Sequence, residues 1–157
     1  MSGAGQVLTL GVGDATFAVP VTSVQEILDL RPVTRLPDAP PHLLGVIDVR
    51  GEGVAVMDLA TILGTMSAGE TDGARIVVLR FPIRDKEAVL GLKADRVYEV
   101  TELDGDALEP LPEWQLLQWN SRFVRGLGRK NSGFVALLDL QRMFASEQAG
   151  HVFDLAA

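Results

Sequence analysis

Short apolar runs separated by glycine, proline and charged residues recur along the chain, and their lengths are typical of β-strands. The clearest unit covers residues 45–63, where two apolar runs flank a Gly-rich turn and a third apolar run follows. The second run, residues 54–57, is apolar at every position, which predicts a strand buried on both faces. Asp58 precedes the third run and Gly64 follows it, so we expect a short helix that begins at an aspartate cap and ends at glycine.

The remaining apolar runs predict further short strands and few helices. We expect strands at residues 6–11, 16–20, 24–27, 33–36, 74–81, 88–92, 97–103, 123–127 and 134–138. One helical turn is expected at residues 42–44 and a second capped helix after Asp139. Residues 104–115 contain two prolines and four acidic residues, so we interpret them as a surface loop.

A weak internal duplication links the two halves of the chain. Residues 54–63 and 135–144 each read as a buried strand, an aspartate and a short helix, and Glu26 and Glu99 stand in similar apolar surroundings. Short strands with frequent turns favour small barrels over an open sheet. We therefore predict two similar β-barrels packed side by side, with the polar connector at residues 64–73 as the seam between halves. The alternative is that short apolar strings match by chance.

Composition narrows the classes of function. The chain has 157 residues, of which 47% are hydrophobic, enough for a substantial core in one domain or two small halves. A net charge of −7 without a basic run argues against a nucleic-acid or anionic-membrane surface. The absence of cysteine excludes disulfides and thiolate chemistry, and fits a reducing compartment. Without a signal-peptide pattern or an apolar run of membrane-spanning length, the simplest expectation is a cytoplasmic protein.

The search for catalytic or metal-binding motifs gives little. His42 and His151 are far apart and form no metal-ligand spacing and no evident triad, so both are expected to be surface or loop residues. Two Gly-x-Gly pairs, at residues 11–13 and 126–128, lie in expected hairpins and lack the rest of a dinucleotide fingerprint. We therefore expect no catalytic residue, no cofactor and no metal.

Two charged residues stand out because apolar sequence surrounds each of them. Glu26 and Arg50 would both be satisfied by an Arg–carboxylate pair between neighbouring strands. Such a pair either fixes the register of strands or lies at a recognition surface. An exposed pair adds at most about 1 kcal/mol to stability, so folding alone gives little reason to keep one. Trp114 and Trp119 offer a docking patch or, alternatively, core packing.

Several of these motifs, taken in order, resemble the CheW family of bacterial chemotaxis coupling proteins. The likeness covers about residues 6–144 and is carried by residues 24–27 (VQEI), 33–36 (VTRL), 45–51 (GVIDVRG), 56–59 (VMDL), 126–128 (GLG) and 137–140 (LLDL), together with Val97. The resemblance implies a mainly β fold of two SH3-like five-stranded barrels with short helices. It also implies a non-enzymatic scaffold in a two-component system that joins the cytoplasmic tip of a chemoreceptor to the histidine kinase CheA.

The resemblance further implies where partners bind. In the family, the residues matching Glu26 and Arg50 are tied to signalling and can pair. An apolar groove between the barrels takes the receptor helix tip, and an edge of the first barrel meets the regulatory domain of the kinase. The matching interaction residues in this sequence are Val24, Glu26, Gly45, Val49, Arg50, Gly51 and Val97. The protein is then expected in the cytoplasm, recruited to receptor arrays.

The expected organisation is a single domain over residues 1–157. One subdomain covers about residues 16–73 with a C-terminal contribution, and the other covers about residues 74–145 with the N-terminal strand added.

The sequence also departs from the family pattern. Asp48 and Val49 replace the usual Asn and Leu before the Arg-Gly pair, Gly53 replaces an apolar turn residue, and Ala55 replaces a frequent proline. The last two changes fall near the expected kinase contact. Two alternative functions stay open: a small-ligand-binding double barrel that uses the cleft between the halves, and a stand-alone modulator or inhibitor of a CheA-type kinase.

Overall fold

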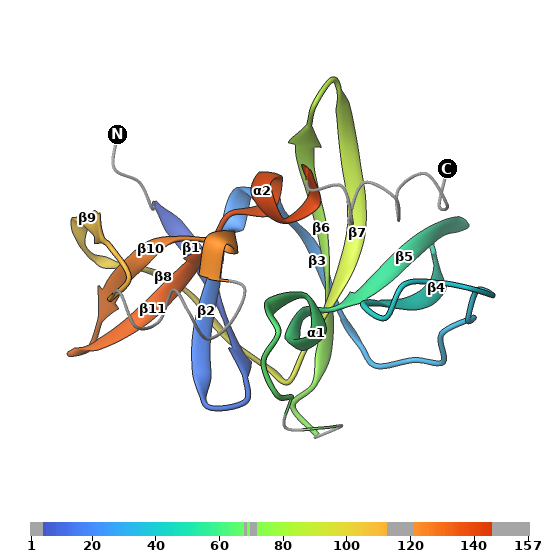
Figure 1. Cartoon of the computed structure of the whole chain (residues 1–157), viewed down its shortest axis with the longest axis horizontal. Helices are drawn as coiled ribbons and strands as arrows, with labels where there is room; N and C mark the ends of the chain where they lie inside the picture. The colour runs from blue at the N-terminus through green and yellow to red at the C-terminus, as the bar shows by residue number, and fades with distance from the viewer. Residues whose placement is uncertain (1–4, 68, 70–71, 113–120, 146–157) are drawn as a thin grey trace.

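The computed structural model describes residues 5–67, 69, 72–112 and 121–145, and shows a mainly β chain folded into two curled sheets side by side (Figure 1). The strands are β1 Gln6–Val12, β2 Ala15–Pro20, β3 Val24–Asp29, β4 Leu43–Val49, β5 Glu52–Asp58, β6 Arg75–Ile83, β7 Lys86–Ala94, β8 Arg96–Glu102, β9 Asp104–Glu109, β10 Val124–Lys130 and β11 Gly133–Leu138. Two short helices, α1 Leu59–Leu63 and α2 Leu140–Ala145, and two 3₁₀ turns, η1 Val21–Ser23 and η3 Ser121–Phe123, complete the described elements.

The two sheets confirm the predicted fold class. One sheet has the order β3-β6-β7-β5-β4, with the five strands expected. The other has the order β8-β1-β2-β11-β10-β9 and so contains a sixth strand, β9. The five-stranded sheet is called the first barrel below, and the six-stranded sheet the second barrel.

The order of strands repeats between the barrels, and each half of the chain lends a hairpin to the other. In both barrels a hairpin pairs in parallel with a strand from the opposite half: β5 with β7 in the first, and β11 with β2 in the second. The first barrel thus joins β3, β4 and β5 to the β6–β7 hairpin, and the second joins the β1–β2 hairpin to β8, β10 and β11. The repeat seen in the sequence is therefore also a repeat of topology.

This exchange of hairpins changes where the barrels divide the chain. Residues 64–73 connect α1 to β6, and β6 pairs with β3 inside the first barrel. The chain instead crosses between the barrels at η1 and at Asp95, so the sheets do not follow the expected limits of 16–73 and 74–145. The apolar pattern predicts most of the strands, but it does not tell which strand becomes the partner of another.

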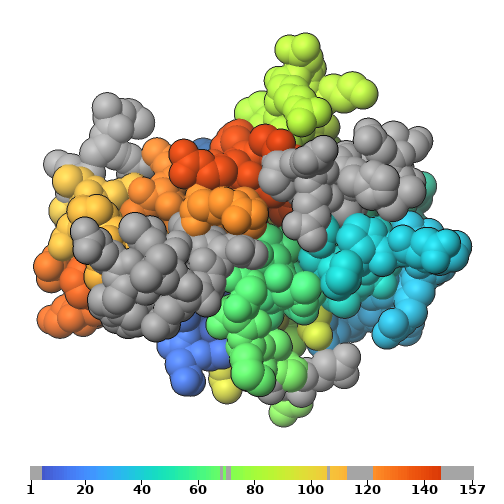
Figure 2. All heavy atoms as spheres, viewed as in Figure 1, coloured from blue at the N-terminus to red at the C-terminus, as the bar shows by residue number. Residues whose placement is uncertain are grey.

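The largest apolar core lies between the two barrels. It combines inner residues of β1 and β2 with one face of β5, β6 and β7, and both helices add apolar side chains to it. The rings of Phe81 and Phe144 meet there with centroids 5.6 Å apart. Each barrel encloses only a small cluster of its own, formed by Ile47, Val49, Val54, Val56 and Ile76 in the first and by Val7, Ala18, Val135 and Leu137 in the second. The shared core therefore unites the two barrels into one body, from which the β6–β7 hairpin projects (Figure 2).

Three local predictions were wrong. Residues 104–109 form the edge strand β9, which pairs with β10, although the acids and nearby prolines indicated a loop. The residues expected as a helical turn at 42–44 instead lead into β4, which begins at Leu43. Residues 33–36 form a single bridge, Thr34 to Val46, in place of a short strand. In each case pairing with a distant segment decided the local conformation.

The helices begin and end where the sequence predicts, but only one of the two aspartates makes a capping hydrogen bond. The backbone N–H of Arg142 donates to Asp139 Oδ1 at 2.9 Å, as expected for an N-cap. Asp58 occupies the N-cap of α1 with an extended backbone, but its carboxylate accepts instead from the Thr61 hydroxyl at 2.6 Å. Gly64 ends α1 with φ of 70°, the left-handed conformation that glycine adopts without strain.

Candidate interaction site

The turn between β4 and β5 positions the arginine singled out from the sequence. Arg50 and Gly51 both have positive φ, 55° and 86°, which makes a two-residue hairpin turn between Val49 and Glu52. Asp48 Oδ1 accepts the Gly51 N–H at 2.8 Å and holds the turn. Glycine adopts positive φ without strain at the second position, whereas Arg50 at the first position is a non-glycine residue in this conformation. The arginine side chain is thereby presented at the end of the hairpin, 81% exposed.

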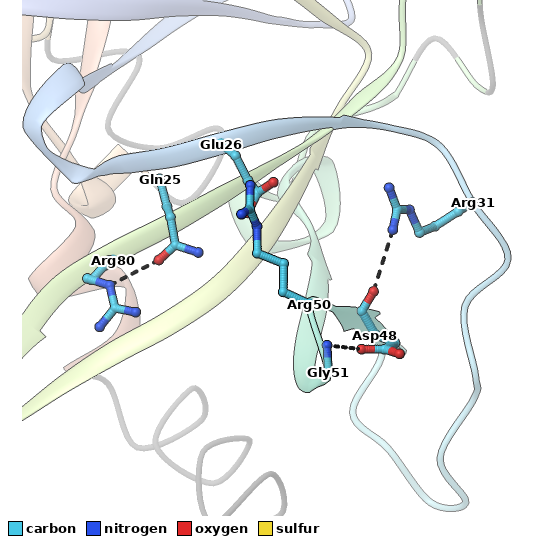
Figure 3. A network of polar contacts seen from close by, with 7 residues as sticks. All are labelled: Gln25, Glu26, Arg31, Asp48, Arg50, Gly51 and Arg80. Carbon is cyan, nitrogen blue, oxygen red and sulfur yellow. Dashed lines mark hydrogen bonds and ion pairs between the residues drawn. The ribbon is translucent and has the colours of Figure 1, made fainter.

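The predicted ion pair is present. Arg50 Nε donates to Glu26 Oε2 at 3.3 Å, and the glutamate side chain is only 21% exposed (Figure 3). The two residues do not come from neighbouring strands, however, since β3 and β4 lie at opposite edges of the five-stranded sheet. The pair therefore spans the opening left when the sheet curls and brings its two edges together.

The same opening contains a pocket of about 340 Å³, called the Arg50 pocket below. It is lined by Gln25, Glu26, Val49, Arg50, Glu52, Val54, Arg80 and Val89. Arg80 donates to Gln25 Oε1 at 3.0 Å and to Glu87 Oε1 at 2.7 Å. Both cations of this pocket thus have a carboxylate partner, over a floor of valines from the barrel interior.

A second connection closes the barrel on the other side of β4. Thr34 and Val46 exchange two backbone hydrogen bonds, of 2.9 and 2.8 Å. Gly45 has φ of 148°, and a Cβ added there would overlap the carbonyl oxygen of Thr34. Gly45 is therefore required for the approach of the segment that follows β3.

The structure gathers some of the expected interaction residues and separates others. Glu26, Arg50 and Val49 meet in the Arg50 pocket, with Gly51 in the adjoining turn. Gly45 lies on the same hairpin but at the Thr34 bridge. Val24 opens β3 and Val97 lies in β8 of the other barrel; both are half-buried and pack against the shared core. The two valines therefore flank the places where the chain crosses between the barrels.

Sequence reasoning missed Gln25, Arg80 and Glu87, which extend the polar network around Glu26. A signal was present for Arg80, because it is a lone cation within an apolar run, as Arg50 is. Its partner Glu87 lies across the β6–β7 hairpin, and the register that places Arg80 opposite Val89 was not predictable from the run alone.

His42 was expected to be a surface or loop residue; it does lie in a loop, but it is buried and not at the surface. The residue lies in a turn, but its side chain is only 6% exposed and its Nε2 atom has no hydrogen-bond partner among the described residues. Burial disfavours the charged imidazolium, so the pKa of His42 is lowered from its ordinary value. Within the described ranges, no three metal-ligating side chains gather into a cluster. His151, Trp114 and Trp119 lie outside the described residues.

Comparisons with known proteins relate the whole fold to one family. The family model of the CheW-like domain matches residues 6–148. A probable chemotaxis protein CheW of Rhizobium etli is 31% identical over 144 residues, which covers 92% of this chain and 90% of the relative. Chemotaxis protein CheW of Rhizobium meliloti is 29% identical over 147 residues, covering 94% and 92% of the two chains. The crystal structure of scaffolding protein TtCheW from Thermoanaerobacter tengcongensis superposes with a TM-score of 0.77 at 22% identity, covering 94% of this chain and 92% of that one.

Proposed function

Because this chain belongs to the CheW-like domain family, we propose that it is a chemotaxis adaptor that couples chemoreceptors to a CheA-type histidine kinase and catalyses no reaction itself. The observation that carries the proposal is the family match over residues 6–148, which spans both barrels. The names of the relatives, chemotaxis proteins in each case, favour an adaptor over a small-ligand-binding barrel. Such an adaptor works by surface complementarity with two proteins at once. In this role we expect it at the cytoplasmic tips of receptors.

We assign the Glu26–Arg50 pair to recognition and coupling. Arg50 is mostly exposed, and a pair of this kind contributes about 0–1 kcal/mol to stability. A charged pair at an interface sets orientation and partner choice more than affinity. Its place over the Arg50 pocket supports this assignment, because a partner side chain that enters the pocket meets both charges.

Of the remaining expected residues, we assign some to contact with partners and others to holding the hairpin and the pocket in shape. Val24 and Val97 are half-buried beside the crossings between barrels, where the apolar groove for the receptor helix tip is expected. Gly45 and Gly51 act through the backbone, by shaping the hairpin that carries Arg50. Val49 contributes to the floor of the Arg50 pocket.

The two departures near the expected kinase contact have different consequences. Gly53 is exposed on β5, so the loss of an apolar side chain there reduces the surface offered to the kinase. Ala55 is only 8% exposed and belongs to the shared core, where it contacts the rest of the protein. We therefore expect Gly53→Ile, and not Ala55→Pro, to strengthen kinase binding.

Receptor-dependent control of kinase activity in reconstituted arrays tests the assignment of the pair. We expect Arg50→Ala and Glu26→Ala to lower receptor-dependent control while the melting temperature stays within a few degrees of wild type. The exchange variant, Glu26→Arg with Arg50→Glu, tests whether the pair or its polarity matters. Arg129→Ala serves as the matched control, since it removes an arginine from an exposed pair on the second barrel. Full control in the Arg50 and Glu26 variants would refute this role.

A further inference from the structure

The first barrel has a second opening, and its charges differ from those of the Arg50 pocket. A pocket of about 350 Å³, called the basic pocket below, is lined by Leu30, Arg31, Pro32, Val33, Arg35, Leu44, Val56, Ile76 and Lys93. Val56 and Ile76 belong to the small cluster inside the barrel, and Leu30, Val33 and Leu44 pack against it. The lining therefore combines an apolar floor with three cations and no acid.

The three cations lack the carboxylate partners that neutralise the Arg50 pocket. Among the described residues, no carboxylate oxygen lies within ion-pair distance of Arg31, Arg35 or Lys93. Arg31 reaches only the backbone carbonyl of Asp48, at 3.5 Å (Figure 3). Asp58 stands opposite Lys93 in the strand register, but its carboxylate accepts from the Thr61 hydroxyl. In a chain of net charge −7, this opening is a local concentration of uncompensated positive charge.

The walls of the basic pocket are fixed before any ligand arrives. The segment that bears Arg31, Val33 and Arg35 is tied to β4 by the paired backbone bonds between Thr34 and Val46. The opposite wall consists of paired strands β5, β6 and β7. A preformed pocket requires little ordering of the protein upon binding, which favours its use as a recognition site.

We propose that the basic pocket binds an acidic segment of a partner protein, which inserts one large apolar side chain while its carboxylates meet Arg31, Arg35 and Lys93. The apolar floor accounts for the anchor side chain, and the unpaired cations account for the flanking acids. The cations come from the segment after β3 and from β7, on either side of the opening, and so suit charges spread along a peptide. This site is separate from the Glu26–Arg50 pair and does not depend on the proposed function.

Titration of the ¹⁵N-labelled full chain with a short synthetic peptide, rich in Glu and with one central Phe, tests the proposal. We expect saturable shifts of the amide signals of Val33, Leu44 and Ile76. A peptide with Ala in place of Phe tests the anchor, and one with Lys in place of Glu tests the charge. Raising the salt concentration should weaken binding, because the rim charges are exposed.

Charge-reversal variants complete the test. Arg35→Glu and Lys93→Glu should each lower the affinity for the peptide by about tenfold or more. Lys86→Glu makes the same charge change at an exposed position outside both pockets and should leave binding unchanged. Melting curves establish that each variant is folded. The proposal is overturned if the pocket signals do not move, if the peptides with and without Phe bind equally, or if Lys86→Glu weakens binding as much as Lys93→Glu. Signal broadening that depends on protein concentration without peptide would identify a second copy as the occupant instead, and also overturns it.

Discussion

The β4–β5 and β10–β11 hairpins occupy equivalent places in the two barrels, and they use their arginines differently. Both turns have two residues with positive φ, Arg50–Gly51 in one and Asn131–Ser132 in the other. In the first barrel the arginine lies in the turn itself and reaches Glu26 on the far edge strand. In the second, Arg129 lies in β10, two residues before the turn, and pairs with Glu109 of the adjacent strand β9.

The difference separates a pair that attaches an edge strand from a pair that lies mostly exposed over a pocket. Arg129 also stacks over the Phe134 ring, 4.7 Å from its centroid, and Asp104 of β9 accepts the Asn131 N–H at 3.0 Å. These contacts hold the extra strand β9 against the second barrel. Among the described residues, the first barrel has only the single Thr34–Val46 bridge at the corresponding edge of β4 and no strand there, and its Arg50 is 81% exposed above a pocket. Hairpins of equivalent backbone geometry therefore place an arginine in different surroundings in the two barrels.

Gly45 and Gly126 each allow a neighbouring segment to approach the backbone closely. Their substitution gives the largest expected difference in stability between the barrels. Gly45→Ala places a Cβ against the Thr34 carbonyl at a φ that alanine rarely adopts, so we expect a loss of about 2–3 kcal/mol in unfolding free energy. Gly126 occupies the equivalent position in β10, where a Cβ would lie 2.9 Å from the Glu109 carbonyl without positive φ. We expect Gly126→Ala to cost about 1 kcal/mol. Urea denaturation measures both losses in unfolding free energy. Equal losses would contradict the view that Gly45 is constrained more strongly than Gly126.

A buried residue precedes each of the two hairpins, and only the one in the first barrel, His42, can titrate. We therefore expect a difference in stability that depends on pH. His42 and Phe123 each accept a backbone N–H from the aspartate before a short helix, and both side chains are buried. Because burial lowers the pKa of His42, the unfolded chain binds its proton more readily than the folded chain. Stability is therefore complete above the ordinary histidine pKa of about 6.5 and declines as the pH falls below it.

The variant His42→Phe places in the first barrel the residue type that Phe123 provides at the equivalent position of the second barrel. We expect this variant to lose the part of the acid sensitivity that comes from His42. Thermal melts between neutral pH and pH values below the histidine pKa give the comparison. An unchanged difference in melting temperature between the two pH values would show that His42 does not titrate with unfolding.

The ion pairs give the smallest expected difference in stability. Arg129→Ala removes a pair, a cation–π contact and the attachment of β9, so we expect a loss of about 1 kcal/mol. Arg50→Ala should cost less, about 0.5 kcal/mol, because only the exposed pair is lost. Denaturation midpoints of the two variants measure this order. The reverse order would indicate that the Glu26–Arg50 pair mainly holds the first barrel closed.

The sequence predicted most strands because their apolar runs face the core, although β3 and β8 contain no fully buried residue. The run at residues 54–57 is buried at every position, as its composition indicated. The pairing of Glu26 with Arg50 was also predictable, since each charge is isolated in apolar sequence and needs a partner. The exchange of hairpins between the halves was anticipated only for the N-terminal strand, because the apolar pattern of β2, β6 and β7 is the same whichever half they pair with.

The site was only partly predictable for the same reason. The cations of the basic pocket come from β7 and from the segment after β3. These two segments are brought together by sheet pairing and by the Thr34 bridge, which the sequence pattern does not reveal. The burial of His42 was not predicted, because histidine is common both in turns and in partly buried positions. Strand β9 is held by side-chain contacts with Arg129 and Asn131, which lie 20 and 27 positions from their partners Glu109 and Asp104.

In the proposed function, this protein physically joins a receptor to a kinase. The direct measurement immobilises a receptor cytoplasmic fragment, adds a CheA-type kinase with and without this protein, and quantifies the kinase retained. We expect strong retention only when this protein is present, with reduced receptor-dependent kinase activation for Arg50→Ala and unchanged activation for Arg129→Ala. Equal retention of the kinase with and without this protein, or binding of this protein to neither partner, would contradict the account.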